Sequence, residues 1–542
     1  MIFMTVKSIR KSCEPLLILC LMFSAAACRT VPDGSAGTSA AAAADVNAGP
    51  SVPMPKGFRY QSRGRVLVVE AGDPIRLTFT SPPDFHSIDR EMIRLTGKED
   101  GEEIPLEWTV SGNQIIIRPL CRFVPRESGR SAVFPETGRY LPHEKGIRYL
   151  GMVPDGSYRL VLSGALADLQ GRSLADPLEL EIRTTDLQYG LYWMGPDGYC
   201  ARFIPGESNP YYDPDKPVIL FSHGWQPGMI HPEYWMQQPW HWFSWGDKPL
   251  DLSGPWLEKG YNIGFWNWGQ FADEENVWTA EQKIWKTATS GRWNGPPVQG
   301  LRYRLRDGGY RFVETGYSIG DMFFRAYTEA LADFRGGSVT LAGHSLGNQT
   351  VTALAGLLGD AVRKGEISER LLPDRLVLLD PFWGSTHLSH VNGRSPAELC
   401  TDIVRELVSD HGLAVEQIMT SGLGGLVTGD ENLAMRELSA FYRVWPAFIP
   451  MWNQSGRHQY AIEWYFASMS LRLAGMGAAP IGAAAEREDV LRNMNFGMES
   501  PRLWYSTGEG SMTPEPEDDY FLMEKGLENS LMTNPAPLPG GG

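Results

Sequence analysis

A glycine-flanked serine lies in the stretch VTLAGHSLGNQT, residues 339 to 350. Gly343-His344-Ser345-Leu346-Gly347 fits the pattern G-x-S-x-G, with apolar residues before it and small, helix-compatible residues after it. In a tight strand-to-helix turn, a Cβ at either glycine would clash, and the helix N-terminus places partial positive charge near developing negative charge. These flanks favour Ser345 as a nucleophile over a serine that only occupies a turn.

Acyl transfer also requires donors for the tetrahedral oxygen. The sequence VILFSHGWQPG places His223-Gly224 after an apolar stretch upstream of Ser345. Because glycine lets the backbone approach a substrate, we expect the amides of Trp225 and Leu346 to form an oxyanion hole. The alternative is a solvent loop with an incidental His-Gly step.

The acid of a triad is expected after a later strand, and RLVLLDPFW ends its apolar run at Asp380. Its role would be to hold the catalytic imidazole in the correct tautomer. The alternative is an aspartate that caps a turn with Pro381.

The base is expected C-terminal to the acid, in the chain order Ser, Asp, His. The candidates are His387, His390, His411 and His458. His458 lies in MWNQSGRHQYAIEWYFASMSL, in a glycine-containing loop before an amphipathic helix, and we predict it as the base.

Residues 187 to 510 contain short apolar runs that alternate with helical stretches, which predicts an α/β domain with a mostly parallel sheet. Helices are expected over IGDMFFRAYTEALADFRGG and LGNQTVTALAGLLGDAVRKG. The expected strands are 217–225, 261–269, 338–345, 375–383 and 439–446.

Residues 57 to 186 show short alternating strands separated by Gly, Pro, Asp and Asn, which predicts an all-β sandwich. The order PIRLTFTSPPDFHS, NQIIIRPL and GSYRLVLSGALADLQGRSLADPLELEIRTTD resembles bacterial Ig-like domains of surface and S-layer proteins. The resemblance implies that this domain spaces or binds and does no chemistry.

The first 28 residues are typical of an export signal, with a basic start, an apolar run and small residues before Cys28. This end resembles the lipobox of bacterial lipoproteins, which implies lipidation of Cys28 and a membrane anchor in the periplasm or at the cell surface. An ordinary cleaved signal peptide is the alternative. Residues 29–56 are expected to be a disordered linker and residues 511–542 a flexible acidic and Pro/Gly-rich tail.

The formal net charge of -15 argues against nucleic acid as a partner. Outside the predicted signal and lipidation site, Cys121, Cys200 and Cys400 are widely spaced, so one disulfide is the most that these three can form. The sequence contains no HExxH, P-loop or EF-hand motif, and we expect no metal or cofactor.

FSHGW, GFWNWG, GHSLG, LLDP and RHQYAIEWYFASM occur in the same order as their counterparts in the lipase family of pancreatic and lipoprotein lipases, which this chain resembles over residues 217 to about 471. The resemblance implies an α/β-hydrolase fold, with Ser345, Asp380 and His458 as the triad and the Trp225 and Leu346 amides as the oxyanion hole. It departs at Asn267, where that family often has aspartate, and between residues 270 and 318.

We therefore expect a serine hydrolase that acts on carboxylic esters, with lipid esters as the leading class. A small-ester esterase, a thioesterase or an acyltransferase would use the same triad. Eleven of the 18 tryptophans fall between Trp225 and Trp293, where they would either meet lipid or pack over the sheet. A non-catalytic surface binding protein on a hydrolase scaffold remains the alternative from another class. The sequence does not indicate an oligomeric state.

Overall fold

The structure is a computed structural model. It describes residues 57–61, 64–125, 147–228, 243–245, 248–288, 300–387, 393–422, 429–444, 446, 449–469, 481–499, 503–507 and 521–525. The predicted signal peptide with Cys28 and the linker 29–56 lie outside these residues.

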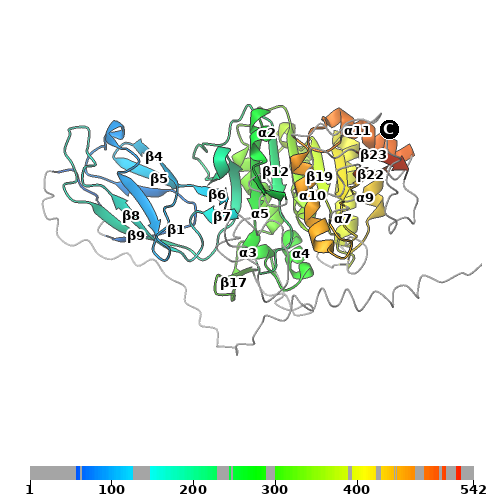
Figure 1. Cartoon of the computed structure of the whole chain (residues 1–542), viewed down its shortest axis with the longest axis horizontal. Coiled ribbons are helices and arrows are strands. Elements are labelled where there is room, and N and C mark those ends of the chain that lie inside the picture. Colours follow the sequence, from blue (N-terminus) through cyan, green and yellow to red (C-terminus); the bar gives the residue numbers. More distant parts are fainter. Residues whose placement is uncertain are drawn as a thin grey trace, which may run out of the picture.

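The N-terminal part consists of two small sheets that share one apolar core (Figure 1). Alternate residues of each strand point into this core, as in Ile75 and Leu77 of β2, because side chains along a strand alternate between faces. One sheet has the order β1 (Val66–Val69), β9 (Leu178–Thr184), β8 (Ser157–Leu162) and β3 (Ile93–Gly97). The other has the order β2 (Ile75–Thr78), β5 (Gln114–Pro119) and β4 (Leu106–Ser111). The resemblance of this part to Ig-like domains stays a prediction.

A large mixed sheet of 12 strands forms the second body. Its central strands are parallel and fully buried, as expected for strands covered on both faces. In spatial order they are β23 (Phe521–Lys525), β22 (Leu503–Thr507), β21 (Ala440–Arg443), β20 (Ala414–Met419), β19 (Arg375–Leu379), β18 (Val339–His344), β12 (Val218–Ser222), β15 (Asn262–Asn267), β10 (Gly190–Met194), β11 (Tyr199–Arg202), β6 (Cys121–Pro125) and β7 (Ile147–Leu150).

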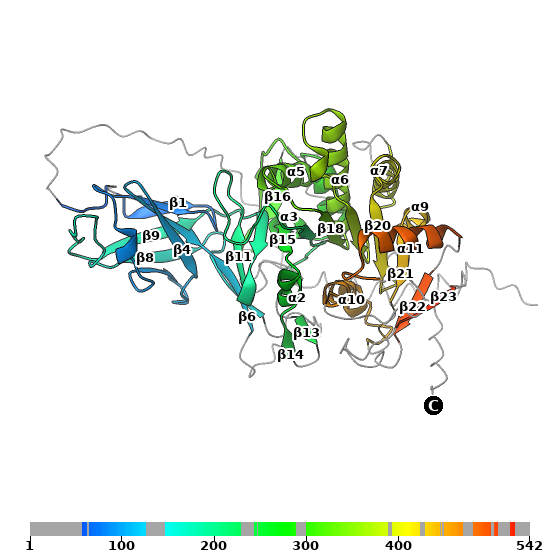
Figure 2. The same ribbon diagram turned by 90° about the horizontal axis from the view of Figure 1, so that it is seen from above.

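Helices cover both faces of the large sheet. In Figure 2, α5 (Ile319–Ala330), α6 (Gly347–Arg363) and α7 (Pro396–His411) lie on one side, and α2 (Ser253–Glu258) and α10 (Gln454–Ala467) on the other. The start of α5 is set by a capping box between Ser318 and Asp321. The remaining described helices are α3 (Gly269–Ala272), α4 (Val277–Trp285), α9 (Leu433–Glu437), α11 (Arg487–Glu499) and the 3₁₀ turns Phe85–Ser87, Pro196–Gly198 and Glu369–Leu371.

Two short hairpins complete the second body, β13 (Phe243–Trp245) with β14 (Lys248–Leu250) and β16 (Leu301–Arg304) with β17 (Tyr310–Val313). The second hairpin contacts α3, and its strand β17 lies at the lower edge of the sheet in Figure 1. The carboxyl ends of the parallel strands meet at this edge, where open α/β sheets place their functional groups.

The strands β6 and β7 lie within the segment 57–186 that the sequence predicts as a sandwich, yet they pair into the large sheet beside β11. Their side chains Phe123 and Tyr149 belong to the core of the second body. A disulfide joins Cys121 of β6 to Cys200 of β11, with Cα atoms 5.2 Å apart. The predicted boundary at residue 186 therefore does not separate the two cores along the chain.

Each of the five strands expected in the α/β domain contains an observed strand, namely β12, β15, β18, β19 and β21. The sequence prediction omitted β20, which lies between β19 and β21. It also included no strand in the tail 511–542, where Phe521–Lys525 forms β23 and pairs with β22. Within the described segments, no helix is both long and apolar enough to cross a bilayer.

Candidate active site

Ser345 occupies the turn between the end of β18 and the start of α6. Its φ is 55°, a left-handed conformation that few residues other than glycine adopt. Its backbone N–H donates to the carbonyl of Leu379 at 3.0 Å, so the turn is tied to the end of the neighbouring strand β19. The serine is partly exposed, whereas the residues on both sides of it are buried. The structure thus confirms the strand, turn and helix that the sequence predicted here.

Gly343 and Gly347 must be glycines because the backbone approaches each of them too closely for a Cβ atom. A Cβ on Gly343 would lie 2.6 Å from the carbonyl oxygen of Gly347, and a Cβ on Gly347 would lie 2.6 Å from the carbonyl oxygen of His223. Both distances are shorter than real Cβ contacts, so the turn could not close around larger residues.

Asn348, near the start of α6, stabilises the backbone around Ser345 through hydrogen bonds of its side chain. Its Nδ2 donates to the carbonyls of Ser345 at 2.9 Å and Leu379 at 3.0 Å, and its Oδ1 accepts from the Leu379 amide at 3.1 Å. The side chain is fully buried, so these bonds form away from competing water. This role of Asn348 was not predicted from the sequence, although a polar residue three positions after the serine could have indicated it.

Asp380 and His458 meet beside this turn. The Nδ1 atom of His458 lies 2.8 Å from Oδ2 of Asp380, and the carboxylate is 2% exposed. The amides of Thr420 and Ser421, which follow β20, donate to Oδ1 of Asp380 at 3.3 and 3.4 Å. Both carboxylate oxygens of Asp380 accept hydrogen bonds, so the imidazole is oriented with Nδ1–H donating to Oδ2. Within the described residues, Nε2 of His458 has no hydrogen bond and can accept a proton.

His344, the residue before the nucleophile, supports the base. Its Nε2 lies 3.0 Å from the carbonyl oxygen of His458, to which it donates, and the two rings are 4.4 Å apart. This contact fixes the backbone of α10 at His458. The sequence predicted His458 in the loop before this helix, whereas the structure places it inside the helix, four residues after its start. The sequence analysis did not assign a role to His344, a variable position of the motif.

The other candidate histidines lie elsewhere. His387 is exposed with Nε2 3.4 Å from Glu398, and Nδ1 of His411, the last residue of α7, lies 3.5 Å from Glu369. His390 lies outside the described residues. Of the candidates that the structure describes, His458 is the one paired with Asp380.

The loop after β12 lies against the nucleophile. A Cβ on Gly224 would lie 2.7 Å from Cβ of Ser345 and 3.1 Å from the amide nitrogen of Leu346. In the described part of the chain, neither the Trp225 amide nor the Leu346 amide donates to another protein group. Two such amides beside Ser345 are what a developing oxyanion needs.

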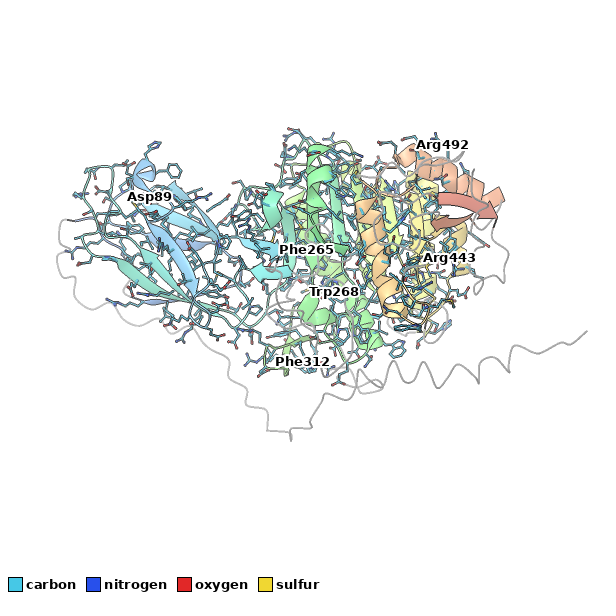
Figure 3. All side chains as sticks on the ribbon, viewed as in Figure 1. Asp89, Phe265, Trp268, Phe312, Arg443 and Arg492 are labelled. Carbon is cyan, nitrogen blue, oxygen red and sulfur yellow. A yellow bond between two sulfur atoms is a disulfide. The ribbon has the colours of Figure 1, made fainter. Side chains whose placement is uncertain are left out.

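His223 is a structural residue of this loop. Its Nδ1 donates to the carbonyl of Gly224 at 3.0 Å, and its Nε2 accepts from the amide of Trp268 at 3.2 Å. Burial lowers the pKa of His223 to about 4, so the ring is neutral at physiological pH. Figure 3 shows Trp268 between Phe265 of the sheet and Phe312 of β17, and its ring stacks on His223 with centroids 5.5 Å apart.

The tryptophans divide between two environments. Trp256, Trp266 and Trp268 are buried against the sheet, as the packing alternative predicted. Trp452 is 76% exposed and lies six residues before His458, next to the 44% exposed Met451. Several others, in 229–242 and 289–299, lie outside the described residues. In the segments that the structure describes, no group of three or more His, Cys, Asp or Glu side chains could hold a metal.

No family model matches this chain. No curated protein matches it either. Among solved structures it is similar to a thermostable esterase, with 9% identity and a TM-score of 0.22 over 75% of this chain and 95% of that one. It is also similar to LpqC, a poly(3-hydroxybutyrate) depolymerase from Bordetella parapertussis, with 14% identity and a TM-score of 0.21 over 48% of this chain and 70% of that one.

A further similarity is to the N-terminal part of the bacterial S-layer protein SbsC, with 15% identity and a TM-score of 0.15 over 23% of this chain. The chain spans 24% of the length of that structure and 14% of a longer structure of the same protein.

Proposed function

We propose that the chain is an exported serine hydrolase that cleaves carboxylic esters through Ser345, His458 and Asp380, with lipid esters of the acylglycerol type as its substrate class. The observation that carries the proposal is the 2.8 Å contact between His458 Nδ1 and Asp380 Oδ2 beside a serine held at a φ of 55°. A serine that only occupied a turn would not require a buried carboxylate and an oriented imidazole next to it.

In the proposed reaction, Oγ of Ser345 attacks the acyl carbon while Nε2 of His458 accepts its proton. Asp380 stabilises the imidazolium through Nδ1–H, and the amides of Trp225 and Leu346 donate to the tetrahedral oxygen. His458 then protonates the departing alkoxide, which leaves an acyl-enzyme on Ser345. Water attacks this ester by the same route in reverse, and His458 again accepts and returns the proton.

The exposed apolar residues Met451 and Trp452 support the choice of lipid esters. They precede α10 at the carboxyl edge of the sheet, the edge at which Ser345 and His458 lie. Large apolar side chains exposed beside a polar site are suited to contact with long acyl chains or a lipid surface.

The buried disulfide between Cys121 and Cys200 supports export, because disulfides persist in oxidising compartments. Together with the signal-like residues 1–28, it supports a mature chain that is anchored through a lipid on Cys28 in the periplasm or at the cell surface. The ester substrate and the membrane are then the partners of the protein.

Hydrolysis of p-nitrophenyl esters from acetate to palmitate, by the wild type and by Ser345→Ala, tests the proposal. We expect turnover that rises with acyl length and is lost in Ser345→Ala. Turnover of acetate and butyrate alone would assign a small-ester esterase instead. No turnover of any ester by the wild type would contradict ester hydrolysis.

A further inference from the structure

Four charged side chains are buried together beside the loop that carries Trp225. They lie on the turn after α3, on α4 and on β16, and all are less than 10% exposed. These residues, named here the buried ion cluster, are Asp273, Glu274, Lys283 and Arg302. Two acids and two bases balance in formal charge, which is the condition for charges to remain buried.

The contacts within the cluster fix the turn 271–274. Lys283 Nζ lies 2.5 Å from Oε1 of Glu274 and donates to the carbonyl of Phe271 at 2.7 Å. Arg302 Nε donates to the same carboxylate at 3.0 Å, and its guanidinium also bonds the second oxygen. Its guanidinium stacks 4.0 Å from the ring centroid of Tyr310. One carboxylate thus ties the turn to α4 and to the hairpin.

The same turn holds the loop that follows β12. The indole Nε1 of Trp225 donates to the carbonyl of Glu274 at 2.7 Å, and the amide of Gln226 donates to the carbonyl of Ala272 at 3.2 Å. The amide of Gly228 donates to Oδ1 of Asp273 at 2.9 Å. Three contacts therefore connect the turn to residues 225–228, which directly follow Gly224 beside Ser345.

We propose that the buried ion cluster positions residues 224–228, the loop after β12 that carries Trp225, and that Glu274 and Lys283 act on catalysis through the Trp225 amide without touching the substrate. This rests on the proposed function. Lys283 and Glu274 are positioning residues: without the Lys283 bonds to Glu274 and Phe271, the turn and the loop attached to it lose their fixed place. An oxyanion donor that is displaced contributes less to the transition state, in which the loss of one donor costs about 10²–10³ in rate.

The second-order rate constant for labelling by a fluorophosphonate tests this, because the phosphonyl oxygen occupies the oxyanion hole. The variants are Lys283→Met and Glu274→Gln, and the matched control is Arg375→Met. Arg375 also forms a buried pair, with Glu416, in which Nε lies 3.1 Å from Oε2, but at the opposite end of β19 from Asp380. Thermal unfolding of each variant reports its stability, and rates are compared at equal folded fraction.

We expect Lys283→Met to be labelled roughly tenfold or more slowly than Arg375→Met, although both lose stability. We expect Glu274→Gln to be labelled slowly as well and to lose more stability than Lys283→Met, because it leaves both Lys283 and Arg302 without their carboxylate partner. Labelling of Lys283→Met at the rate of Arg375→Met would overturn the proposal.

Trp225→Phe tests the proposal if the cluster variants do not fold. It replaces the indole of a partly exposed side chain by a smaller ring that has no N–H to donate to the carbonyl of Glu274. We expect slower labelling, and an unchanged rate would overturn the role of this contact. A wild-type protein that is not labelled at all would instead overturn the proposed function. The two failures are therefore distinct.

Discussion

Nδ1 of His458 lies 2.8 Å from Oδ2 of Asp380, although the two residues are 78 positions apart in the chain. The contact is possible because β19 ends immediately before Asp380 and α10 begins four residues before His458, both at the carboxyl edge of the same sheet. The fold therefore brings an acid and a base to the turn that carries Ser345.

Replacing Asp380 by asparagine removes the charge and allows the wrong imidazole tautomer. We expect Asp380→Asn to lower kcat by about 10⁴, the loss typical of this substitution in a Ser-His-Asp triad, with little change in KM. The control is Asp374→Asn, whose carboxylate accepts from the Val339 amide at 2.8 Å at the other end of the strands. Ester hydrolysis measures both, and near-wild-type activity of Asp380→Asn would exclude it as the acid.

Gly224→Ala places a methyl group where Ser345 and the carbonyl of His344 lie, at 2.7 and 2.8 Å. The loop must move away from the nucleophile, so we expect roughly a hundredfold slower acylation, as for loss of an oxyanion donor. The control is Gly254→Ala in α2, where an added Cβ meets nothing within 4 Å. The acylation rate is measured in single-turnover experiments. Equal rates for Gly224→Ala and Gly254→Ala would show that the loop at Gly224 does not contribute to acylation.

Glu281 of α4 predicts a pH dependence of stability. Its carboxylate is 2.6 Å from Nε2 of Gln349, and burial raises its pKa to about 7. The raised pKa means that the native state binds the proton more tightly than the unfolded state. Its contribution to stability is therefore complete below the unfolded pKa of about 4.5 and is lost as pH rises through about 7.

Chemical denaturation of Glu281→Gln between pH 4 and pH 8 measures this contribution. We expect the wild type to lose on the order of 3 kcal/mol relative to this variant across the range, since one pKa unit corresponds to about 1.4 kcal/mol. Parallel stability curves for the two proteins would mean that Glu281 does not titrate in this window.

Cys28 predicts membrane attachment. We expect the full chain, expressed in a bacterial host with a lipoprotein pathway, to incorporate labelled palmitate and to partition into detergent. Cys28→Ser should abolish both, since it removes the sulfur that would carry the lipid. Release of Cys28→Ser into the soluble exported fraction would agree with the anchor, whereas an unlabelled, soluble wild type would indicate an ordinary signal peptide.

The local pattern around Ser345 was sufficient to predict the nucleophile turn, because a strand, two glycines and a helix are encoded within a dozen residues. Asp380 and His458 could be predicted because chain order and strand ends limit where the partners of a serine can lie. These parts of the site depend on short-range signals and on topology that the parallel sheet imposes.

Other parts could not be predicted. The burial of Glu274 and Lys283 could not be predicted, because charged residues in a sequence are expected at the surface. Their burial depends on pairing with each other and with Arg302, which comes from a different element of the fold. The strands β6 and β7 alternate like those around them, and periodicity does not reveal which sheet a strand joins. Because β20 was not predicted, the sequence also did not indicate that the amides of Thr420 and Ser421, which follow this strand, would donate to Asp380.

Mass spectrometry of the protein after reaction with a fluorophosphonate tests directly whether Ser345 is the nucleophile. We expect one phosphonyl adduct, located on Ser345, which is absent from Ser345→Ala and forms far more slowly in His458→Ala. An adduct on another serine, equal labelling of the wild type and Ser345→Ala, or no adduct on the folded wild type would contradict this role of Ser345.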